Sequence, residues 1–232
     1  MSRRKIAISV AITTLVLVLA TNAGASLIGI YRNGMETDSQ RGQIKKLSGE
    51  NCGRGGSSHA FRMLVGKRTQ ECSYATPVVG RDLEIVAIGR LLSKTPKKLQ
   101  RKAFISVSLR TGNAGAGYQL VVYPLQRKAQ LRRKLSNGKV RYLRVAKNVR
   151  SVKGINSANE LKLRAFNVTS GPDKGSCRIR ALVGHRVIGD VTDDASGELD
   201  GRASGFSIGA NGNAKGAVGS FDDVVLRVPN PF

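Results

Sequence analysis

The sequence contains no tryptophan, only two histidines and three cysteines, and few acidic residues. It has 15 Asp and Glu against 39 Lys and Arg, which gives a formal charge of +24 at pH 7. Neither His59 nor His185 stands at a zinc-site spacing from the cysteines, so a zinc site is not expected. After the N-terminal segment, no apolar run approaches the roughly 20 residues that span a bilayer. These absences argue against a zinc protein and against a protein with several membrane spans.

Sustained helical periodicity is also missing. The 27 glycines and six prolines suit many tight turns better than long helices. A chain of 232 residues, less a leader, is long enough for one domain with a sizeable core. We find no internal repeat, linker or second domain, so the composition predicts a single all-β domain.

The N-terminus has the three parts of a secretory signal. Arg3, Arg4 and Lys5 form a basic region, residues 6–20 are mostly apolar, and residues 23–25 (Ala-Gly-Ala) are small, as a cleavage site requires. Residues 1–25 are therefore predicted to be a signal peptide, with an uncleaved anchor as the alternative. No cysteine follows that would carry a lipid anchor. Removing the three leader cations from +24 leaves +21 on residues 26–232. The protein is expected to be secreted or to lie in the cell envelope.

Export permits disulfide formation, and three cysteines allow one bridge and one free thiol. Cys52 and Cys72 flank a Gly-rich segment and a candidate strand, so a bridge between them would close a loop of about 20 residues. We favour this pairing. Cys177 remains a possible partner for either cysteine.

Apolar residues alternate with polar ones along many short segments that are bounded by Gly, Asn, Asp or Pro. Residues 50–58 are too rich in Gly and Ser to predict a strand, and residues 60–65 and 70–79 are interpreted as a hairpin across Gly66-Lys67. Asn137-Gly138 is the strongest hairpin signal in the chain. Strands are expected at residues 27–31, 43–47, 60–65, 70–79, 82–88, 104–110, 118–123, 129–135, 140–145 and 160–168, and in three closing runs between residues 177 and 228.

Two segments carry further information. Residues 125–135 have leucines at a helical spacing, but the preceding Tyr123-Pro124 and the following Asn-Gly turn favour a strand over a helix. Residues 93–102 are interpreted as a basic loop that Pro96 interrupts. Charge is uneven: residues 90–164 hold 20 Lys and Arg and one acid, whereas residues 190–223 hold seven acids and two bases. If consecutive strands are neighbours, the domain has a basic middle and an acidic end.

Several motifs in order resemble those of the concanavalin A-like lectin/glucanase superfamily, and most of all the laminin-G-like domains of bacterial secreted proteins. The resemblance covers about residues 80–228 and implies an antiparallel β-sandwich, or jelly roll, over residues 26–232. The usual tryptophans of the family are absent, and Val183-Gly184-His185 replaces its Asn-Gly turn. The motifs are Phe104–Arg110, Gly117-Tyr-Gln-Leu, Asn159-Glu-Leu-Lys-Leu, Val187–Asp193, Gly205-Phe-Ser-Ile-Gly and Ser220-Phe-Asp-Asp-Val.

The sequence offers little for catalysis. Glycan hydrolases need two carboxylates on either side of the scissile bond, and only Glu198-Leu-Asp200 comes near the Glu-x-Asp-x-x-Glu pattern of this fold. We therefore expect no catalytic residues and no enzyme. Asp190, Asp193 and Asp194 have oxygen ligands that suit calcium, but we favour turn formation as the reason for these aspartates. No cofactor is expected. One aspartate of Asp222-Asp223 is expected to cap or pair at a sheet edge.

A basic cluster around the Asn-Gly hairpin is the best candidate binding surface. Alternate residues of a hairpin face the same way and would form a ribbon of charge, with Tyr118, Tyr123 and Tyr142 available for stacking. A solvated polar face is the competing interpretation. The cluster consists of Arg127, Lys128, Arg132, Arg133, Lys134, Arg141 and Arg144, with Lys139 beside it.

Export, the resemblance and the basic charge together predict a secreted, non-catalytic module that binds carbohydrate or an anionic polymer of the cell envelope. We expect a polysaccharide or other polyanion as partner, no specific nucleic acid, and no membrane contact beyond the leader. Two alternatives remain open: a glycan hydrolase or lyase on the same fold, and a structural extracellular domain without a ligand.

Overall fold

The computed structural model describes residues 27–35, 37–57, 60–112, 115–194, 199 and 201–229. Residues Gly29–Val228 form one compact unit. The expected signal peptide, residues 1–25, lies outside the described residues. Among the residues that are described, no helix is long and apolar enough to cross a membrane.

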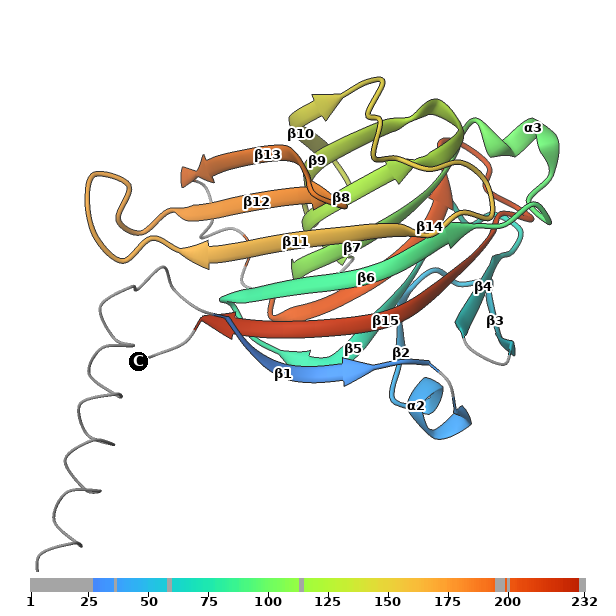
Figure 1. Cartoon of the computed structure of the whole chain (residues 1–232), viewed down its shortest axis with the longest axis horizontal. Coiled ribbons are helices and arrows are strands. Elements are labelled where there is room, and N and C mark those ends of the chain that lie inside the picture. The colour runs from blue at the N-terminus through green and yellow to red at the C-terminus, as the bar shows by residue number, and fades with distance from the viewer. Residues whose placement is uncertain are drawn as a thin grey trace, which may run out of the picture. The chain divides into compact units, whose positions relative to one another are not determined.

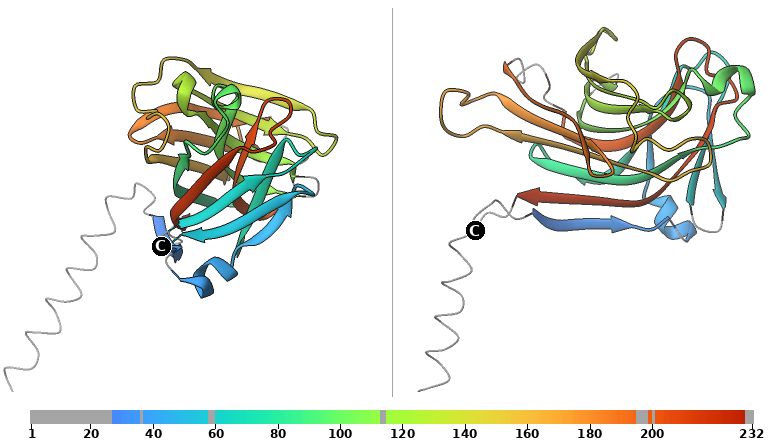
Figure 2. Two further views of the ribbon diagram at one scale, coloured as in Figure 1. Left: turned by 90° about the vertical axis from the view of Figure 1, so that its right-hand side faces the viewer. Right: turned by 45° about the horizontal axis from the view of Figure 1, so that its top comes forward.

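Two sheets form the compact unit (Figures 1 and 2). The eight-stranded sheet runs in the order β13 (Arg186–Asp193), β12 (Cys177–Val183), β11 (Asn159–Asn167), β6 (Leu83–Leu91), β15 (Val218–Pro229), β4 (Ala60–Val65) and β3 (Cys52–Ser57), and β1 (Leu27–Asn33) pairs with β15. The seven-stranded sheet runs in the order β10 (Val140–Ala146), β9 (Lys128–Lys134), β8 (Gly117–Tyr123), β7 (Ala103–Thr111), β14 (Ala203–Ala210), β5 (Glu71–Val79) and β2 (Lys45–Ser48). Neighbouring strands within each ordered path run antiparallel. The predicted all-β antiparallel sandwich is confirmed.

The core lies between the sheets because alternate strand residues on the two facing sides are apolar. Phe61 on β4 and Phe221 on β15 come from one sheet, and Tyr74 on β5 and Phe206 on β14 come from the other. Their ring centroids are 4.6 to 5.6 Å apart in three successive pairs. Each buried aromatic side chain contributes about 2 to 3 kcal/mol, so this chain of rings holds the sheets together at one end of the core.

The turns and the strand assignments around the basic cluster follow the sequence prediction. Residues 128–134 form strand β9 and not a helix, and β10 returns beside it in antiparallel register. The Asn137-Gly138 turn joins the two strands, and Gly138 has the positive φ, +80°, that favours glycine in such a turn. The sequence did not predict the short helices α2 (Asp38–Gly42) and α3 (Lys97–Gln100); α3 lies within the segment expected to be a loop.

Two predictions about the N-terminal third are wrong. Residues 52–57, expected to be a loop, form the edge strand β3, because pairing with β4 uses backbone groups that Gly and Ser also supply. β4 and β5 do not form a hairpin: β4 pairs with β3 and β15 in one sheet, and β5 pairs with β2 and β14 in the other. The chain crosses between sheets there, since each strand buries one face in the shared core.

The favoured disulfide is present. Cys52 on β3 and Cys72 on β5 are bonded, with their Cα atoms 5.7 Å apart. Because these strands belong to different sheets, the bridge ties the sheets together. Cys177 is free and buried, and burial raises the pKa of its thiol to about 11.

Candidate functional site

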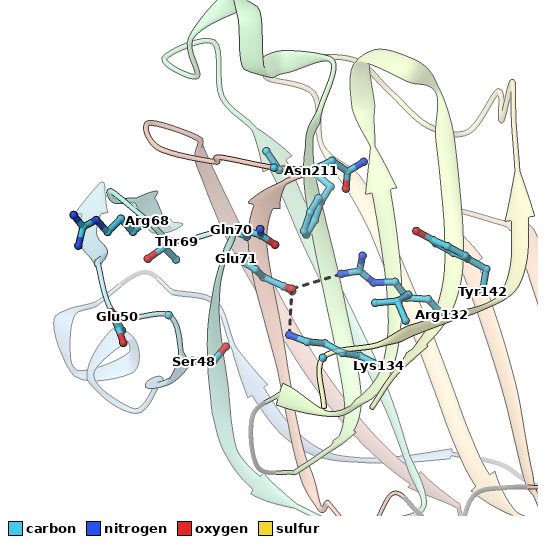
Figure 3. A pocket seen from close by; sticks show the side chains of 16 residues that line it. Ser48, Glu50, Arg68, Thr69, Gln70, Glu71, Arg132, Lys134, Tyr142 and Asn211 are labelled. Carbon is cyan, nitrogen blue, oxygen red and sulfur yellow. Dashed lines mark ion pairs between the residues drawn. The ribbon is translucent and has the colours of Figure 1, made fainter. Parts of the chain in front are cut away.

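A groove of about 530 Å³ lies over the outer face of the seven-stranded sheet (Figure 3). Strand alternation locates it: Leu131 and Arg133 of β9 point into the sandwich, so Arg132 and Lys134 point to the outer face. The start of β5 supplies Glu71. The remaining walls come from β10 and from the loops around residues 48–50, 68–70 and 210–212.

Glu71 is at the centre of a polar network on the groove floor. Its carboxylate lies 3.5 Å from the guanidinium of Arg132 and 3.8 Å from the ammonium of Lys134. It also accepts hydrogen bonds from Ser207 Oγ at 2.5 Å and from Gln119 Nε2 at 3.3 Å. Arg132 Nε donates in turn to Gln119 Oε1 at 2.8 Å. These bonds join β5, β14, β8 and β9, so the charged groups are held in fixed positions before any ligand arrives.

The aromatic residues at the groove are of two kinds, some covered by other side chains and one exposed to solvent. The Arg132 guanidinium lies 5.3 Å from the ring centre of Phe104. Tyr123 is buried and donates a hydrogen bond to Asn211 Oδ1 at 3.1 Å, and burial is the main cause that raises its pKa. Tyr142 on β10 is 57% exposed and lies on the side of the groove opposite Arg68 and Thr69 (Figure 3). Tyr142 thus offers an aromatic surface to a ligand.

The structure separates the seven residues of the predicted basic cluster. It brings Arg132 and Lys134 into the groove. Lys128 lies 5.1 Å from the centre of the Tyr123 ring, and Arg127, Arg141 and Arg144 are exposed. A bulge between Tyr142 and Arg144 interrupts the alternation of β10.

Arg133 is not part of a surface, and the prediction of a continuous ribbon that includes it is corrected. It is 5% exposed and pairs with Asp193 at 2.9 Å inside the sandwich. Tyr118, expected to stack on a ligand, is fully buried and donates to Asp193 Oδ2 at 2.8 Å. Burial is the main cause that raises the pKa of Tyr118 far above its ordinary value, and Asp193 adds to it.

The aspartates considered as calcium ligands serve other purposes. Asp193 is neutralised by Arg133, and Asp190 pairs with Arg178 at 3.0 Å. Within the described part of the chain, no three His, Cys, Asp or Glu residues are grouped so as to hold a metal ion. Asp222 pairs with Arg90 and Asp223 with Arg32, but the expected place at a sheet edge is wrong, because β15 lies between β6 and β4 inside its sheet.

The expected division into a basic middle and an acidic end does not survive folding. Acids from both ends of the sequence meet the basic strands: Glu71 reaches Arg132, and Asp193 reaches Arg133. Glu198 and Asp200, the nearest approach to a catalytic pair, lie outside the described residues.

Sequence reasoning missed Glu71, Gln119 and Asn211. Nothing in the sequence distinguishes Glu71 from any other polar residue at the start of a strand. The three residues come together only because β5, β8 and the loop after β14 contribute to the same face of one sheet. Glu71 and Asn211 line the groove with Arg132 and Lys134, and Gln119 supports Glu71 and Arg132 from beneath. The lining residues present both donors and acceptors, which suits a ligand rich in hydroxyl groups.

Comparison with solved structures identifies related folds at low sequence identity. The carbohydrate-binding module CBM66 from Bacillus subtilis superposes with a TM-score of 0.56 at 14% identity over 78% of this chain and 93% of that one. A Bacillus subtilis protein of unknown function with a galectin-like fold gives 0.59 at 13% identity over 88% and 100%. The exoplasmic/lumenal domain of VIP36, in a form bound to Ca²⁺ and Man3GlcNAc, gives 0.51 at 12% identity over 87% and 89%.

The fold is a concanavalin A-like β-sandwich. No protein-family model matches the sequence, and no curated protein matches it. The likeness therefore concerns the concanavalin A-like fold alone.

Proposed function

We propose that the chain is a secreted, non-catalytic carbohydrate-binding module that holds a glycan in the groove over the seven-stranded sheet. The observation that carries the proposal is the fixed Glu71–Arg132–Lys134 network beside the exposed ring of Tyr142. The network supplies donors and acceptors for sugar hydroxyls, and the ring supplies an apolar surface for a sugar face. A volume of about 530 Å³ accommodates a small ligand.

Two further features support this proposal. CBM66 and VIP36 have the same fold, and the first is named as a carbohydrate-binding module while the second was solved with Man3GlcNAc. The disulfide fits an exported protein. We also propose that residues 1–25 are a signal peptide and that residues 26–232 form a laminin-G-like domain. Both parts rest on the sequence motifs described above.

The net charge of +24 extends the proposal to anionic polymers of the cell envelope. Arg127, Arg141 and Arg144 remain exposed on or beside the β9–β10 hairpin and would attract such polymers. Attraction of this kind falls steeply with salt, because each neutralised charge of the polymer releases a counterion.

The test is a glycan and wall-polymer binding array with the purified protein at low and high salt, followed by Tyr142→Ala. Tyr142→Ala is expected to weaken binding of the best glycan by at least about tenfold, the scale typical of an anchoring tyrosine. Val145→Ala is the matched control. It removes an exposed apolar side chain of the same strand that carries no charge and does not line the groove, and it should leave binding within about twofold.

Two outcomes would contradict the proposal. If no glycan binds, the chain is a structural domain; if Tyr142→Ala binds as tightly as the wild type, the ligand does not occupy the groove. Release of sugar products from a polysaccharide by the wild type would overturn the non-catalytic part and favour a hydrolase or lyase.

A further inference from the structure

A second cleft, of about 790 Å³, lies between the loop that follows β10 and the start of β13. Residues 146–151 form one wall and residues 185–188 form the other. Its polar side chains come from Lys147, Asn148, Arg150, Ser151, His185 and Arg186. Among the residues that the structure describes, none that lines this cleft is acidic. Nothing in the proposed glycan groove involves these residues.

The cations of the cleft differ from those arginines of the sheets that have an acidic partner. Arg133 and Arg164 each have a carboxylate within 3 Å. In contrast, no carboxylate of a described residue lies within the 4.0 Å limit of an ion pair from Lys147, Arg150 or Arg186. Bringing like charges together without a counter-charge creates a positive potential in the cleft, and this potential attracts anions.

Ser151 is a second, independent observation. Its side-chain oxygen is buried and has no hydrogen-bond partner among the described residues. Its Cβ lies 3.8 Å from the position that a Cβ on Gly184 would take, so the serine sits against the β12–β13 turn at the cleft wall. Buried hydroxyls are nearly always paired in folded proteins, so this unpaired one beside the cleft has a hydrogen bond to give once its side chain turns toward a ligand atom.

The rest of the lining favours a sugar polymer over a nucleic acid. The described lining of the cleft includes no Phe or Tyr on which a base would stack, and its single ring is that of His185. Val187, which is 41% exposed, also lines the cleft, as does Ala146, so the cations stand beside some apolar surface. Such a surface suits the C–H face of a sugar ring.

We propose that this cleft binds the acidic groups of an anionic polysaccharide. Arg150, Arg186 and Lys147 would pair with sulfate, phosphate or carboxylate groups, and the Ser151 hydroxyl would donate a hydrogen bond to the same ligand. The cleft is a site of its own and does not depend on a glycan in the groove.

The first test measures binding of dextran sulfate to the full chain at several salt concentrations, with uncharged dextran as a blank. Arg150→Ala/Arg186→Ala is expected to weaken binding by at least about tenfold and to lower the slope of log K against log salt by about two. Lys97→Ala/Lys98→Ala is the control, since it removes the same charge from exposed residues of α3. Equal losses in both double variants would overturn the proposal, because diffuse attraction by net charge would then explain the binding.

The second test uses Ser151→Ala. Removing an unpaired buried hydroxyl is expected to leave the unfolding midpoint unchanged or raise it, while the affinity for dextran sulfate falls. Unchanged affinity would contradict the proposed hydrogen bond from the Ser151 hydroxyl to the ligand.

Further arms identify the ligand class. Polygalacturonate in place of dextran sulfate separates carboxylate from sulfate recognition, and inorganic sulfate tests whether the polymer is needed. Tighter binding of single-stranded oligothymidylate than of dextran sulfate would overturn the choice of a polysaccharide. Tyr142→Ala should retain dextran sulfate binding, so failure of the groove proposal and failure of this one can be told apart.

Discussion

Arg132 and Arg133 are adjacent in the sequence, yet they serve opposite faces of the same strand. Arg132 lies in the groove beside Glu71, and Arg133 lies inside the sandwich beside Asp193. Strand alternation predicts that neighbours face apart, but it does not say which residue faces the core. Basic residues are rarely buried, so the sequence favoured a surface position for both. Asp193, which neutralises Arg133, arrives from β13 in the other sheet.

The buried ion pair gives a prediction at this scale. Arg133→Met leaves the Asp193 carboxylate buried without its cation, and breaking such a pair costs about 3 to 5 kcal/mol of unfolding free energy. Equilibrium denaturation in guanidinium chloride measures the loss. Arg141→Met, at an exposed position on β10, is the control and should stay within about 0.5 kcal/mol of the wild type. An equally small effect of both substitutions would mean that the Arg133–Asp193 pair contributes nothing to stability.

Alternation of polar and apolar residues and turn residues predicted most strands and the Asn137-Gly138 hairpin. These local patterns did not predict which distant strands pair. β4 and β5 follow one another and have suitable hairpin composition, yet they enter different sheets. The Gly-rich segment of β3 forms a strand because β4 offers it a free edge. β14 and β15 occupy the middle of the two sheets and do not pair with each other. These choices depend on covering the shared core.

Gly205 on the central strand β14 lies close to the backbone of the neighbouring strand β5. A Cβ at this position would meet the carbonyl oxygen of Tyr74 on β5 and lie 3.3 Å from the Cα of Ala75. Both contacts are with backbone, which cannot turn aside, so Gly205→Ala should cost about 1 to 3 kcal/mol in thermal or chemical unfolding. Gly55→Ala on β3 is the control, since nothing lies within 4 Å of the added carbon there. If both substitutions lower stability alike, crowding at Gly205 is not the cause.

At the scale of the whole molecule, the two sheets are joined by the aromatic chain in the core and by the Cys52–Cys72 bridge. The sequence predicted the pairing of these cysteines. The sequence did not predict that the bridge crosses from one sheet to the other. It does so because β3 pairs with β4 in one sheet and β5 joins the other sheet. Charges from distant segments also mix at this scale, so the basic middle of the sequence meets acids from β5 and β13.

The Cys52–Cys72 bridge is expected to stabilise the folded protein. Its cysteines are 20 residues apart in sequence, and a loop of that length gains about 3 kcal/mol of stability from cross-linking. Cys52→Ser/Cys72→Ser should therefore melt several degrees lower while its far-ultraviolet circular dichroism at low temperature stays that of a β-protein. Dithiothreitol should lower the melting temperature of the wild type and leave that of the variant unchanged. No shift in the wild type under reducing conditions would contradict a stabilising role of the bridge.

Sequence patterns were enough to predict an antiparallel β-sandwich, the bounds of most strands, the Asn-Gly hairpin and the cysteine pairing. These features depend on alternation and turn chemistry within a few residues, or on a loop of limited length. The folded molecule was needed to show which sheet each strand joins, that Arg133 faces the core while Arg132 faces the groove, and that Glu71 and Tyr142 border one groove. Those outcomes depend on burying both sheets against each other, which brings together residues that no local pattern connects.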